Sequence, residues 1–430
     1  MSHSQTPPKV IKKDVHNIKS DQILTSALKV IDVLQRHDHE AYLVGGSVRD
    51  LLLDHQPKDF DVATSASPEE VHKLFRNSRL IGRRFKLVHV RFGREIIEVA
   101  TFRAAAPEDT DSHHHQQNDD GRVLRDNVYG TLVDDAWRRD FTINALYFDP
   151  KQNIVLDHVG GCDDLKTSLV RLIGDPDKRF REDPVRMIRA IRFSTKLDFK
   201  IERHVEEKIL ELGHLLLGIP PARMFDEVLK LFHTGNAVAI FQRLQEYDVL
   251  RYLFPQTAEI LDEGNETATQ LILAGLKSTD QRISQRKPVT PAFLYACLLW
   301  PALQDSMRSH KASIFEAIIK ATEKVMRRQC QHVLVPRRFS IAMREIWSLQ
   351  PRLERRQGRR ALRLLSHPRF RAAYDFLLLR QQAGEDLHEL CDWWTRFQAV
   401  DEEEQSSMLK ALKPEHKGKR GRRRRPKPND

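Results

Sequence analysis

Residues 43–64 read LVGGSVRDLLLDHQPKDFDVAT and combine two chemical signals within one short stretch. An apolar run ends in Gly45 and Gly46, and a helix-like segment follows. Two carboxylates, Asp59 and Asp61, then stand on either side of a single phenylalanine. Glycine directly after a strand lets the backbone approach a ligand closely, and the start of the next helix offers N–H groups to a phosphate. The stretch therefore predicts a phosphate site beside a pair of carboxylates.

Asp59 and Asp61 are expected to share one face of a strand, with Cα atoms about 6.7 Å apart, because alternate strand residues point the same way. Two such carboxylates repel each other unless a cation lies between them. Mg²⁺ held by carboxylates and by substrate phosphates is the usual solution, and two such ions can clamp the attacking and leaving oxygens of a phosphoryl transfer. Arg49, on the first helical turn, would add a charge-assisted phosphate contact.

Each of these signals also has a plain structural interpretation. The D-x-D pair alone could be a solvent-facing strand pair, and the glycine pair alone could be a tight turn. A third carboxylate strengthens the catalytic interpretation: Glu98 stands among apolar residues on an expected central strand, where a buried carboxylate is costly unless it is paired or bound to metal. An edge-strand glutamate is the alternative interpretation of Glu98.

The composition describes a chain of 430 residues, enough for two or three domains, with 30% charged and 40% hydrophobic residues. The polar N-terminus contains no secretory signal, and the longest apolar run, residues 293–303, is too short to cross a bilayer and predicts a core helix. Four cysteines have no metal-site or redox spacing. We therefore expect a cytoplasmic protein with no membrane partner.

The net charge of +11 is concentrated in two segments. Residues 351–371 carry a net charge of +7 and residues 410–430 a net charge of +8, so the rest of the chain has a net charge of −4. Two separate basic segments on a slightly acidic body favour a nucleic-acid partner over a solvated face or a simple disordered tail. The candidate RNA contacts are arginines of these segments: Arg355, Arg356, Arg359, Arg360, Arg422, Arg423, Arg424 and Arg425.

Local patterns predict a small mixed head followed by helices. Helical spacing covers residues 23–34, and Ser67 with Glu70 forms a capping box for a helix over residues 68–75. Short strands are expected over residues 42–44, 60–63 and 96–100. A polar insert over residues 105–127 contains His113, His114 and His115 and predicts a flexible loop rather than a metal site. Residues 163–394 are almost wholly helical in pattern.

A helix is also expected to begin near Asp183, with Asp183 as N-cap and Pro184 as the first helical residue. Arg186, Arg189 and Arg192 follow at three-residue intervals and should lie on one side of that helix. Three arginines on one side require an anionic partner, because no acidic residue follows them within the helix. A surface of salt bridges is the alternative interpretation.

The quoted stretch resembles the head domain of the class II nucleotidyltransferases, which include bacterial poly(A) polymerases and CCA-adding enzymes. The resemblance continues in the same order through four further motifs, and it covers about residues 23–240. These motifs are IIEVATFR (96–103), RRDFTINALYF (138–148), DHVGGCDDLK (157–166) and REDPVRMIRAIRF (181–193). It implies an α+β head with a polymerase-β-like nucleotidyltransferase fold, a small mixed sheet plus helices, followed by an all-α neck and body.

The resemblance implies a role for each matching residue. Asp59 and Asp61 would bind Mg²⁺, as two ions with Mn²⁺ as a substitute, and Glu98 would support them. Asp140 would be an active-site acid near the ribose, although an N-cap role is compatible with its position. The nucleotide, ATP in this interpretation, would be held by a larger set: Gly45, Gly46, Arg49, Arg139, Glu182, Asp183, Arg186, Arg189 and Arg192.

The implied domain organisation divides the chain into five parts. They are a disordered N-terminus (1–20), a catalytic head (21–156), a helical neck forming the nucleotide pocket (157–217), an all-α RNA-binding body (218–400) and a disordered basic tail (401–430). Residues 401–430 end in an arginine run and are expected to order only on a partner.

The poly(A) polymerase branch fits this chain better than the CCA-adding branch. GRRFKLVHVRFG (82–93), IPPARMFDEVLKLF (219–232) and the arginine-rich segment 355–380 resemble that branch, and no HD-type phosphohydrolase motif is present. The expected reaction is addition of AMP from ATP to RNA 3′ ends with release of pyrophosphate, and RNA-decay proteins would dock on the body or tail. A CCA-adding enzyme and a non-catalytic RNA-binding protein remain the alternatives, although a lapsed site need not keep clustered carboxylates.

Overall fold

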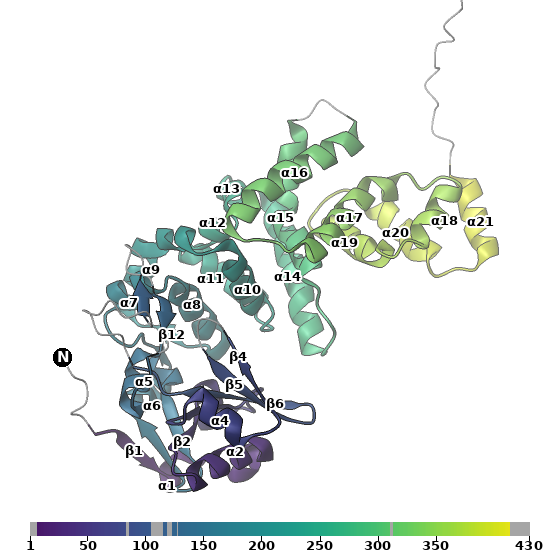
Figure 1. Ribbon diagram of the computed structural model, residues 1–430. Coiled ribbons are helices and arrows are strands. Elements are labelled where there is room, and N and C mark those ends of the chain that lie inside the picture. The colour runs from purple at the N-terminus through teal and green to yellow at the C-terminus, as the bar shows by residue number, and fades with distance from the viewer. Residues whose placement is uncertain are drawn as a thin grey trace, which may run out of the picture. The chain divides into compact units, whose positions relative to one another are not determined.

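The computed structural model describes residues 7–82, 86–104, 115–117, 123–126, 128–309 and 313–412. The chain divides into two compact units, the first formed by Met1–Arg223 with Ala239–Tyr252 and the second by Met224–Val238 with Leu253–Asp430. The first unit contains the mixed α+β head and the helices that follow it, and the second is helical (Figure 1). This is the fold class that the sequence predicts.

In the described residues, eight strands of the first unit form one mixed sheet in the order β1-β10-β9-β2-β3-β6-β5-β4. Only β3 and β6 run parallel; every other neighbouring pair is antiparallel. The strands are β1 (Lys9–Lys12), β2 (Ala41–Val44), β3 (Asp61–Thr64), β4 (Ser78–Ile81), β5 (Leu87–Phe92), β6 (Glu95–Thr101), β9 (Leu146–Asp149) and β10 (Ile154–Asp157).

Helices of the head pack beside this sheet (Figure 1). Helix α2 (Thr25–Arg36) buries Val30 and Leu34, and α4 (Pro68–Leu74) begins at the predicted capping box of Ser67 and Glu70. The remaining short elements of this region are α1 (Lys13–His16), η1 (Ser20–Gln22), α3 (Gly46–Leu52), α5 (Leu132–Arg138), η2 (Thr142–Asn144) and α6 (Gly161–Lys166).

The segment that leads out of the head is helical apart from a two-residue parallel pair, β11 (Leu169–Val170) with β12 (Lys200–Ile201). Its helices are α7 (Pro176–Glu182), α8 (Val185–Leu197), α9 (Arg203–Leu212), η3 (Gly213–Gly218), α10 (Pro221–Phe232), α11 (Ala237–Glu246) and α12 (Leu250–Leu253). Helix α8 begins one residue later than predicted, at Val185, with Pro184 rather than Asp183 at the N-cap position. The Asp183 side chain lies just before this position and accepts the Val185 N–H at 3.4 Å.

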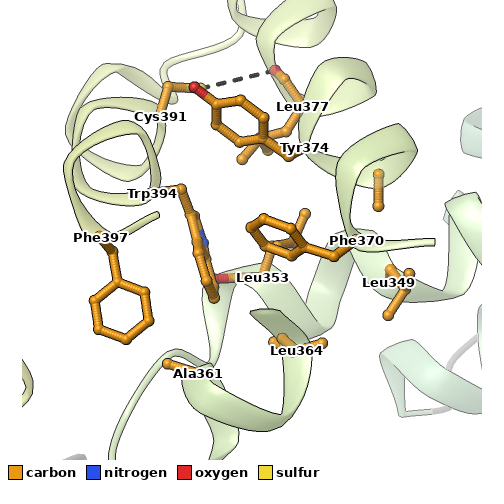
Figure 2. Packing of buried hydrophobic residues seen from close by; sticks show 11 residues of the cluster. Leu349, Leu353, Ala361, Leu364, Phe370, Tyr374, Leu377, Cys391, Trp394 and Phe397 are labelled. Atoms are coloured by element: carbon orange, nitrogen blue, oxygen red, sulfur yellow. Dashed lines mark hydrogen bonds between the residues drawn. The ribbon is translucent and has the colours of Figure 1, made fainter. Parts of the chain in front are cut away.

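In the described part of the chain, the second unit contains most of α10 and the nine helices that follow α12, of which α14 to α17 are the longest. These nine are α13 (Pro255–Asp262), α14 (Glu266–Ser284), α15 (Pro291–Arg308), α16 (Ile314–His332), α17 (Arg337–Glu354), α18 (Arg359–Leu365), α19 (Phe370–Gln382), α20 (His388–Phe397) and α21 (Glu402–Ala411). Helix α15 contains the apolar run and is buried almost throughout, which confirms the predicted core helix. Trp394 lies between Phe370 and Phe397 in a second core, where its indole N–H donates to the Leu353 carbonyl at 3.0 Å (Figure 2).

Three expectations about disorder and loops need correction. Residues 9–12 are not disordered: β1 pairs with β10, a strand some 145 residues later, which supplies partners that a local pattern does not show. Residues 402–411 are not disordered either, because Asp401 caps α21 by accepting the Glu404 N–H at 2.9 Å. Within the predicted loop 105–127, β7 (His115–Gln117) pairs with β8 (Val123–Asp126). His113 and His114 lie outside the described residues.

Candidate active site

A cleft of about 390 Å³ opens over the carboxyl-bearing face of the head sheet. Its walls combine an acidic side and a basic side. Seven of the predicted site residues line it: Asp61, Glu98, Arg139, Asp140, Asp183, Arg186 and Arg189. The volume is in the range of small-molecule sites. The structure therefore brings together residues that are up to 128 positions apart in the sequence.

The acidic side of the cleft is set by strand register. Asp61 begins β3 and is paired with Glu98 on the parallel strand β6, so both carboxylates point to the same face. Partial desolvation and the nearby charges of Glu98 and Asp59 raise the pKa of Asp61 to about 6, against the opposing effect of Arg139. Repulsion among these carboxylates is therefore built into the site.

Two predicted features of these carboxylates differ from the structure. Asp59 lies just before β3 rather than on it, and its side chain is exposed. Glu98 is on an inner strand, as expected, but its side chain is 52% exposed and lies 3.2 Å from the His89 imidazole rather than being buried. The alternation of β6 explains this, because Ile97 and Val99 take the buried face and Glu98 takes the open one.

The glycine turn adopts the conformation that the sequence predicts. Gly45 has φ 76°, in the region that favours glycine, and precedes α3. A Cβ at Gly45 would lie 3.6 Å from the Arg139 guanidinium, so a side chain here would also crowd the cleft. Neither Gly45 nor Gly46 is among the residues that line the cleft itself.

Arg49 is placed differently from the prediction. Its side chain is buried, and its guanidinium donates to the Asp50 carboxylate and, at 2.7 Å, to the Asn144 side-chain oxygen. It also lies 5.4 Å over the Phe193 ring. The guanidinium is thus engaged inside the protein, so Arg49 positions the turn rather than presenting its charge to the cleft.

Arg139 is held by a compact polar group. It follows α5 and donates to Asp135 Oδ2 at 2.8 Å and to the Tyr147 hydroxyl at 2.9 Å, while that hydroxyl donates to the same carboxylate at 2.7 Å. Burial alone would lower the pKa of Arg139, but Asp135 and Tyr147 raise it above its usual range. Arg139 is therefore a fixed cation opposite Asp61.

Asp140 does not cap a helix, because the next turn, η2, begins after Phe141 without a side-chain cap. Its Oδ1 accepts the Phe141 N–H at 2.9 Å, and its Oδ2 forms an ion pair with Arg189. Burial alone would raise the pKa of Asp140, but Arg189 lowers it below the usual range. Asp140 is a charged acid inside the cleft.

Two of the three predicted arginines of α8 have acidic partners from outside that helix. Arg186 donates to Glu182 at 2.8 Å and Arg189 pairs with Asp140, so these two do not by themselves demand a ligand. Asp183 accepts from Arg223 at 2.7 Å. Arg192 lies over Phe193 at 4.8 Å and is absent from the lining of the cleft. Glu182 is likewise absent from that lining, because its carboxylate is turned to Arg179 and Arg186.

Three further arginines of the site were not singled out from the sequence. Arg103 and Arg138 line the cleft, and Arg179 donates to the backbone carbonyls of Arg138 and Arg139 at 2.7 and 2.6 Å. Burial, reinforced by neighbouring cations, lowers the pKa of Arg138 to about 9 and that of Arg179 to about 10. Arg103 and Arg138 lie in the ATFR and RRD motifs, so those motifs could have identified them. Arg179 instead donates to backbone carbonyls, and such a contact leaves no recognisable pattern in the sequence.

The carboxylates fit a divalent cation that also binds phosphate. No cluster of three or more metal-ligating side chains occurs in the described part of the chain, which speaks against an all-protein cage. Asp61 and Glu98, paired across two strands with Asp59 nearby, are instead a small acidic set whose mutual repulsion a cation would relieve. Mg²⁺ is usually bound by one or two carboxylates together with substrate phosphates.

The predicted RNA contacts of the second unit are only partly available. Arg359 and Arg360 are exposed at the start of α18, and Arg355 lies 4.7 Å over Phe315. The Arg356 side chain is 12% exposed, pairs with Glu389 and lies 5.2 Å over Trp393, so it ties the connection between α17 and α18 to α20 instead. The four predicted contacts of the tail, Arg422, Arg423, Arg424 and Arg425, lie outside the described residues.

Trp393 and Trp394 have packing roles. Trp394 is completely buried, and Trp393 stacks on Phe397 with ring centroids 4.4 Å apart. Among the described helices, none is long and apolar enough to span a membrane.

Comparison with known families identifies this architecture. A model of the poly A polymerase head domain matches residues 41–171, one described as a probable RNA- and SrmB-binding site of polymerase A matches residues 198–261, and one of the arginine-rich C-terminus of polymerase A matches residues 310–428. Poly(A) polymerase I of Salmonella typhi is 45% identical over 97% of this chain and 92% of its own length. The chain belongs to the poly(A) polymerase family. It is accordingly a nucleotidyltransferase whose activity is that of a poly(A) polymerase, with nucleotide and RNA as partners.

Other relatives lie further away. Poly(A) polymerase I of Haemophilus influenzae is 42% identical over 96% of the chain and 94% of its own length. A CCA-adding enzyme of Lactobacillus helveticus is 41% identical, but over 52% of this chain and 54% of its own. The solved CCA-adding enzyme of Bacillus stearothermophilus with CTP has a TM-score of 0.55 at 26% identity, covering 86% of this chain and 80% of its own. The poly(A) polymerase branch is therefore the nearer one, as the sequence predicts.

Proposed function

We propose that the head cleft transfers AMP from ATP to the 3′-hydroxyl of RNA and releases pyrophosphate. The observation that supports this most directly is the opposition of Asp61 and Glu98 to a group of cations across one cleft. Arginine side chains remain charged in proteins, so several of them close together repel one another, and a bound polyanion relieves this repulsion. A triphosphate has the charge and the reach to do so.

The cationic side would bind and orient the triphosphate. Arg139 is fixed by Asp135 and Tyr147, and Arg103 and Arg138 line the same wall. Donors held in advance stabilise charge that develops on the phosphates without reorganising at the moment of reaction. Gly45 leaves room beside Arg139 for this contact.

Asp183 and Arg186 would contact the base edge and Asp140 the ribose. Both acids are held by arginines, Asp183 by Arg223 and Asp140 by Arg189, which fixes their positions in the cleft. A pocket formed by side chains suits a reaction without a template, since the protein itself must then select the base.

The acidic side would bind divalent metal through Asp59 and Asp61, with Glu98 in support. When bound, Mg²⁺ (two ions, with Mn²⁺ as a substitute) lowers the pKa of the 3′-hydroxyl and neutralises charge on the α-phosphate. Asp61 and Glu98 share the open face of the sheet, so RNA entering along that face would bring its 3′ end to them.

Extension assays test the proposal directly. Purified protein with Mg²⁺ and a labelled RNA ending in A is offered ATP, CTP, GTP or UTP separately. We expect a long ladder with ATP and little product with the others, and Asp61→Ala should remain folded and add nothing. Retained extension by Asp61→Ala would contradict the site. Addition limited to a few nucleotides, requiring CTP and a tRNA that lacks its end, would move the chain to the CCA-adding branch.

RNA binding would be largely insensitive to sequence. Exposed arginines such as Arg359 and Arg360, and the basic tail, can contact phosphates of unrelated RNAs. Neutralising about six phosphates on a single strand predicts a log–log salt slope near −4. Residues 198–261, which match the model described as an RNA- and SrmB-binding site, are the region that we propose for docking of RNA-decay proteins.

A further inference from the structure

The open face of β4, β5 and β6 continues outward from the catalytic carboxylates. On β5 and β6 one set of alternate residues is buried, including Val88, Val90 and Ile97, under the side covered by α2 and α4. The Ser26 hydroxyl of α2 donates to Glu95 at 2.7 Å, which places α2 on the same side as Ile97. The other set therefore points to the opposite side, the side of the cleft.

Strand register places four side chains in one row on this open face. Asp61 is paired with Glu98, Glu98 with His89, and His89 with Arg79. Adjacent strands are about 4.8 Å apart, so Arg79 lies roughly 14 Å from Asp61 along the row. The charge changes along it from two carboxylates, through an imidazole, to an exposed guanidinium.

Basic and apolar side chains stand together on this face. Arg91 is exposed and paired in register with Ile96, which is 47% exposed, and Ile81 at the end of β4 is 36% exposed. No acidic side chain of the described residues forms an ion pair with Arg79 or Arg91. Exposed apolar residues beside cations that have no acidic partner among the described residues suit a ligand that has both a charged backbone and flat apolar faces.

We propose that this face, defined by Arg79, Ile81, His89, Arg91 and Ile96, is the platform that holds the last nucleotides of the RNA primer. The proposal rests on the proposed function, since it supplies the RNA side of the same reaction. Arg79 and Arg91 bind phosphates, and Ile81 and Ile96 contact ribose and base without reading sequence. A protein partner is the alternative occupant, and in that case variants of this face would leave KM for a short RNA primer unchanged.

The test separates primer binding from nucleotide binding. The double variant Arg79→Glu/Arg91→Glu is compared with wild type on a short oligoadenylate primer, which limits contributions from the basic tail. We expect KM for the primer to rise about tenfold, with KM for ATP and kcat at saturating primer close to wild type. The log–log salt slope should fall by about 1.4, the value for two phosphates on a single strand.

Lys29→Glu is the matched control. Lys29 is exposed on α2, on the covered side of the sheet, so its substitution makes one of the double variant's two charge reversals at a position away from the proposed platform. We expect its KM for the primer to equal that of wild type. Arg79→Gln/Arg91→Gln should give an intermediate rise in KM, because it removes the attraction without adding repulsion.

Photocrosslinking locates the bound RNA without requiring AMP transfer. A primer with 4-thiouridine at its penultimate nucleotide is irradiated with the enzyme in EDTA, and we expect crosslinked peptides from residues 78–96. An unchanged KM for the primer in the double glutamate variant, or a rise equal to that of Lys29→Glu, would overturn the platform. So would crosslinks confined to other segments. If wild-type protein adds no AMP but the crosslinks fall on residues 78–96, the proposed function fails while the RNA path stands.

Discussion

In the head cleft, Asp61 lies beside Glu98 and several arginines crowd the opposite wall. In the C-terminal core around Trp394, by contrast, apolar side chains pack on one another and the polar atoms of Trp394 and Tyr374 are hydrogen-bonded. The Trp394 indole N–H has its acceptor on Leu353, and Tyr374 shares a hydrogen bond with Thr395 at 2.6 Å. The core is arranged for stability (Figure 2). The cleft keeps like charges together, and this costs stability unless a ligand of opposite charge binds.

Replacing Asp61 should have the largest effect on activity. Asp61→Asn removes a proposed ligand for the metal, and we expect kcat/KM to fall on the order of 1000-fold, equivalent to several kcal/mol of transition-state stabilisation. In wild type at limiting Mg²⁺, kcat/KM should also decline as the pH drops through about 6, because a proton then competes for Asp61. Extension rates between pH 5 and 8 measure both effects, and a flat profile would contradict the assignment.

Removing Trp394 from the C-terminal core should lower the stability of the protein and leave nucleotide binding in the head unchanged. Trp394→Ala leaves a cavity beside Phe370 and Phe397 and an unpaired Leu353 carbonyl, so we expect a loss of about 3–5 kcal/mol in the free energy of unfolding. Urea unfolding followed by circular dichroism measures it. KM for ATP of the folded fraction should be unchanged, and a large change in that KM would show that the two regions are not independent.

Replacing Arg179 tests how far activity depends on a residue that holds the backbone of the cleft wall. It contacts the carbonyls of Arg138 and Arg139, so Arg179→Ala should let that wall relax and lower kcat/KM for ATP by about 10- to 100-fold. Arg179→Lys should recover only part of this, because a single ammonium cannot reproduce the fork that also reaches Glu182. Equal activity of both variants and wild type would remove Arg179 from the site.

The smallest expected effects come from replacing Arg356 and Arg359, two arginines of the same basic segment with different predicted roles. Arg356→Ala loses its contacts to Glu389 and Trp393, so we expect a loss of about 1 kcal/mol in stability and little change in RNA affinity. Arg359→Ala should instead lower RNA affinity and leave stability unchanged. Thermal melting and RNA-binding titrations of the two variants, run in parallel, measure the difference, and reversed results would contradict the division of roles.

Much of the cleft could be predicted from the sequence because its signals are local. The period of a strand and the glycine turn identify Asp61 and Gly45, and the order of the motifs supplies Arg139 and Asp140. Roles that depend on distant partners could not be predicted. Arg49 is engaged by Asn144 and Arg356 by Glu389, residues 95 and 33 positions away, and no local pattern shows that a cation is already paired.

The fold shows the same limit. Strand β6 and helix α4 follow from alternation and from a capping box, both of which are local. Strand β1 reads as a polar segment with two apolar residues, and it is ordered only because β10 provides its hydrogen bonds. Helix α21 could have been predicted from Asp401 as N-cap and from the acidic first turn. The prediction misses it because residues 401–430 are interpreted together as one disordered basic tail.

Thermal melting of wild type and Asp61→Asn at pH 7.5 tests the central claim most directly. The folded-state pKa of Asp61 is raised to about 6, so its charge disfavours folding above that pH, and the asparagine variant should melt at a higher temperature than wild type in EDTA. Addition of Mg²⁺ and a non-hydrolysable ATP analogue should stabilise wild type and reverse the order. If the variant melts lower than wild type in EDTA, or gains as much from Mg²⁺ and nucleotide, the carboxylates are not a strained metal site and the account of the cleft is wrong.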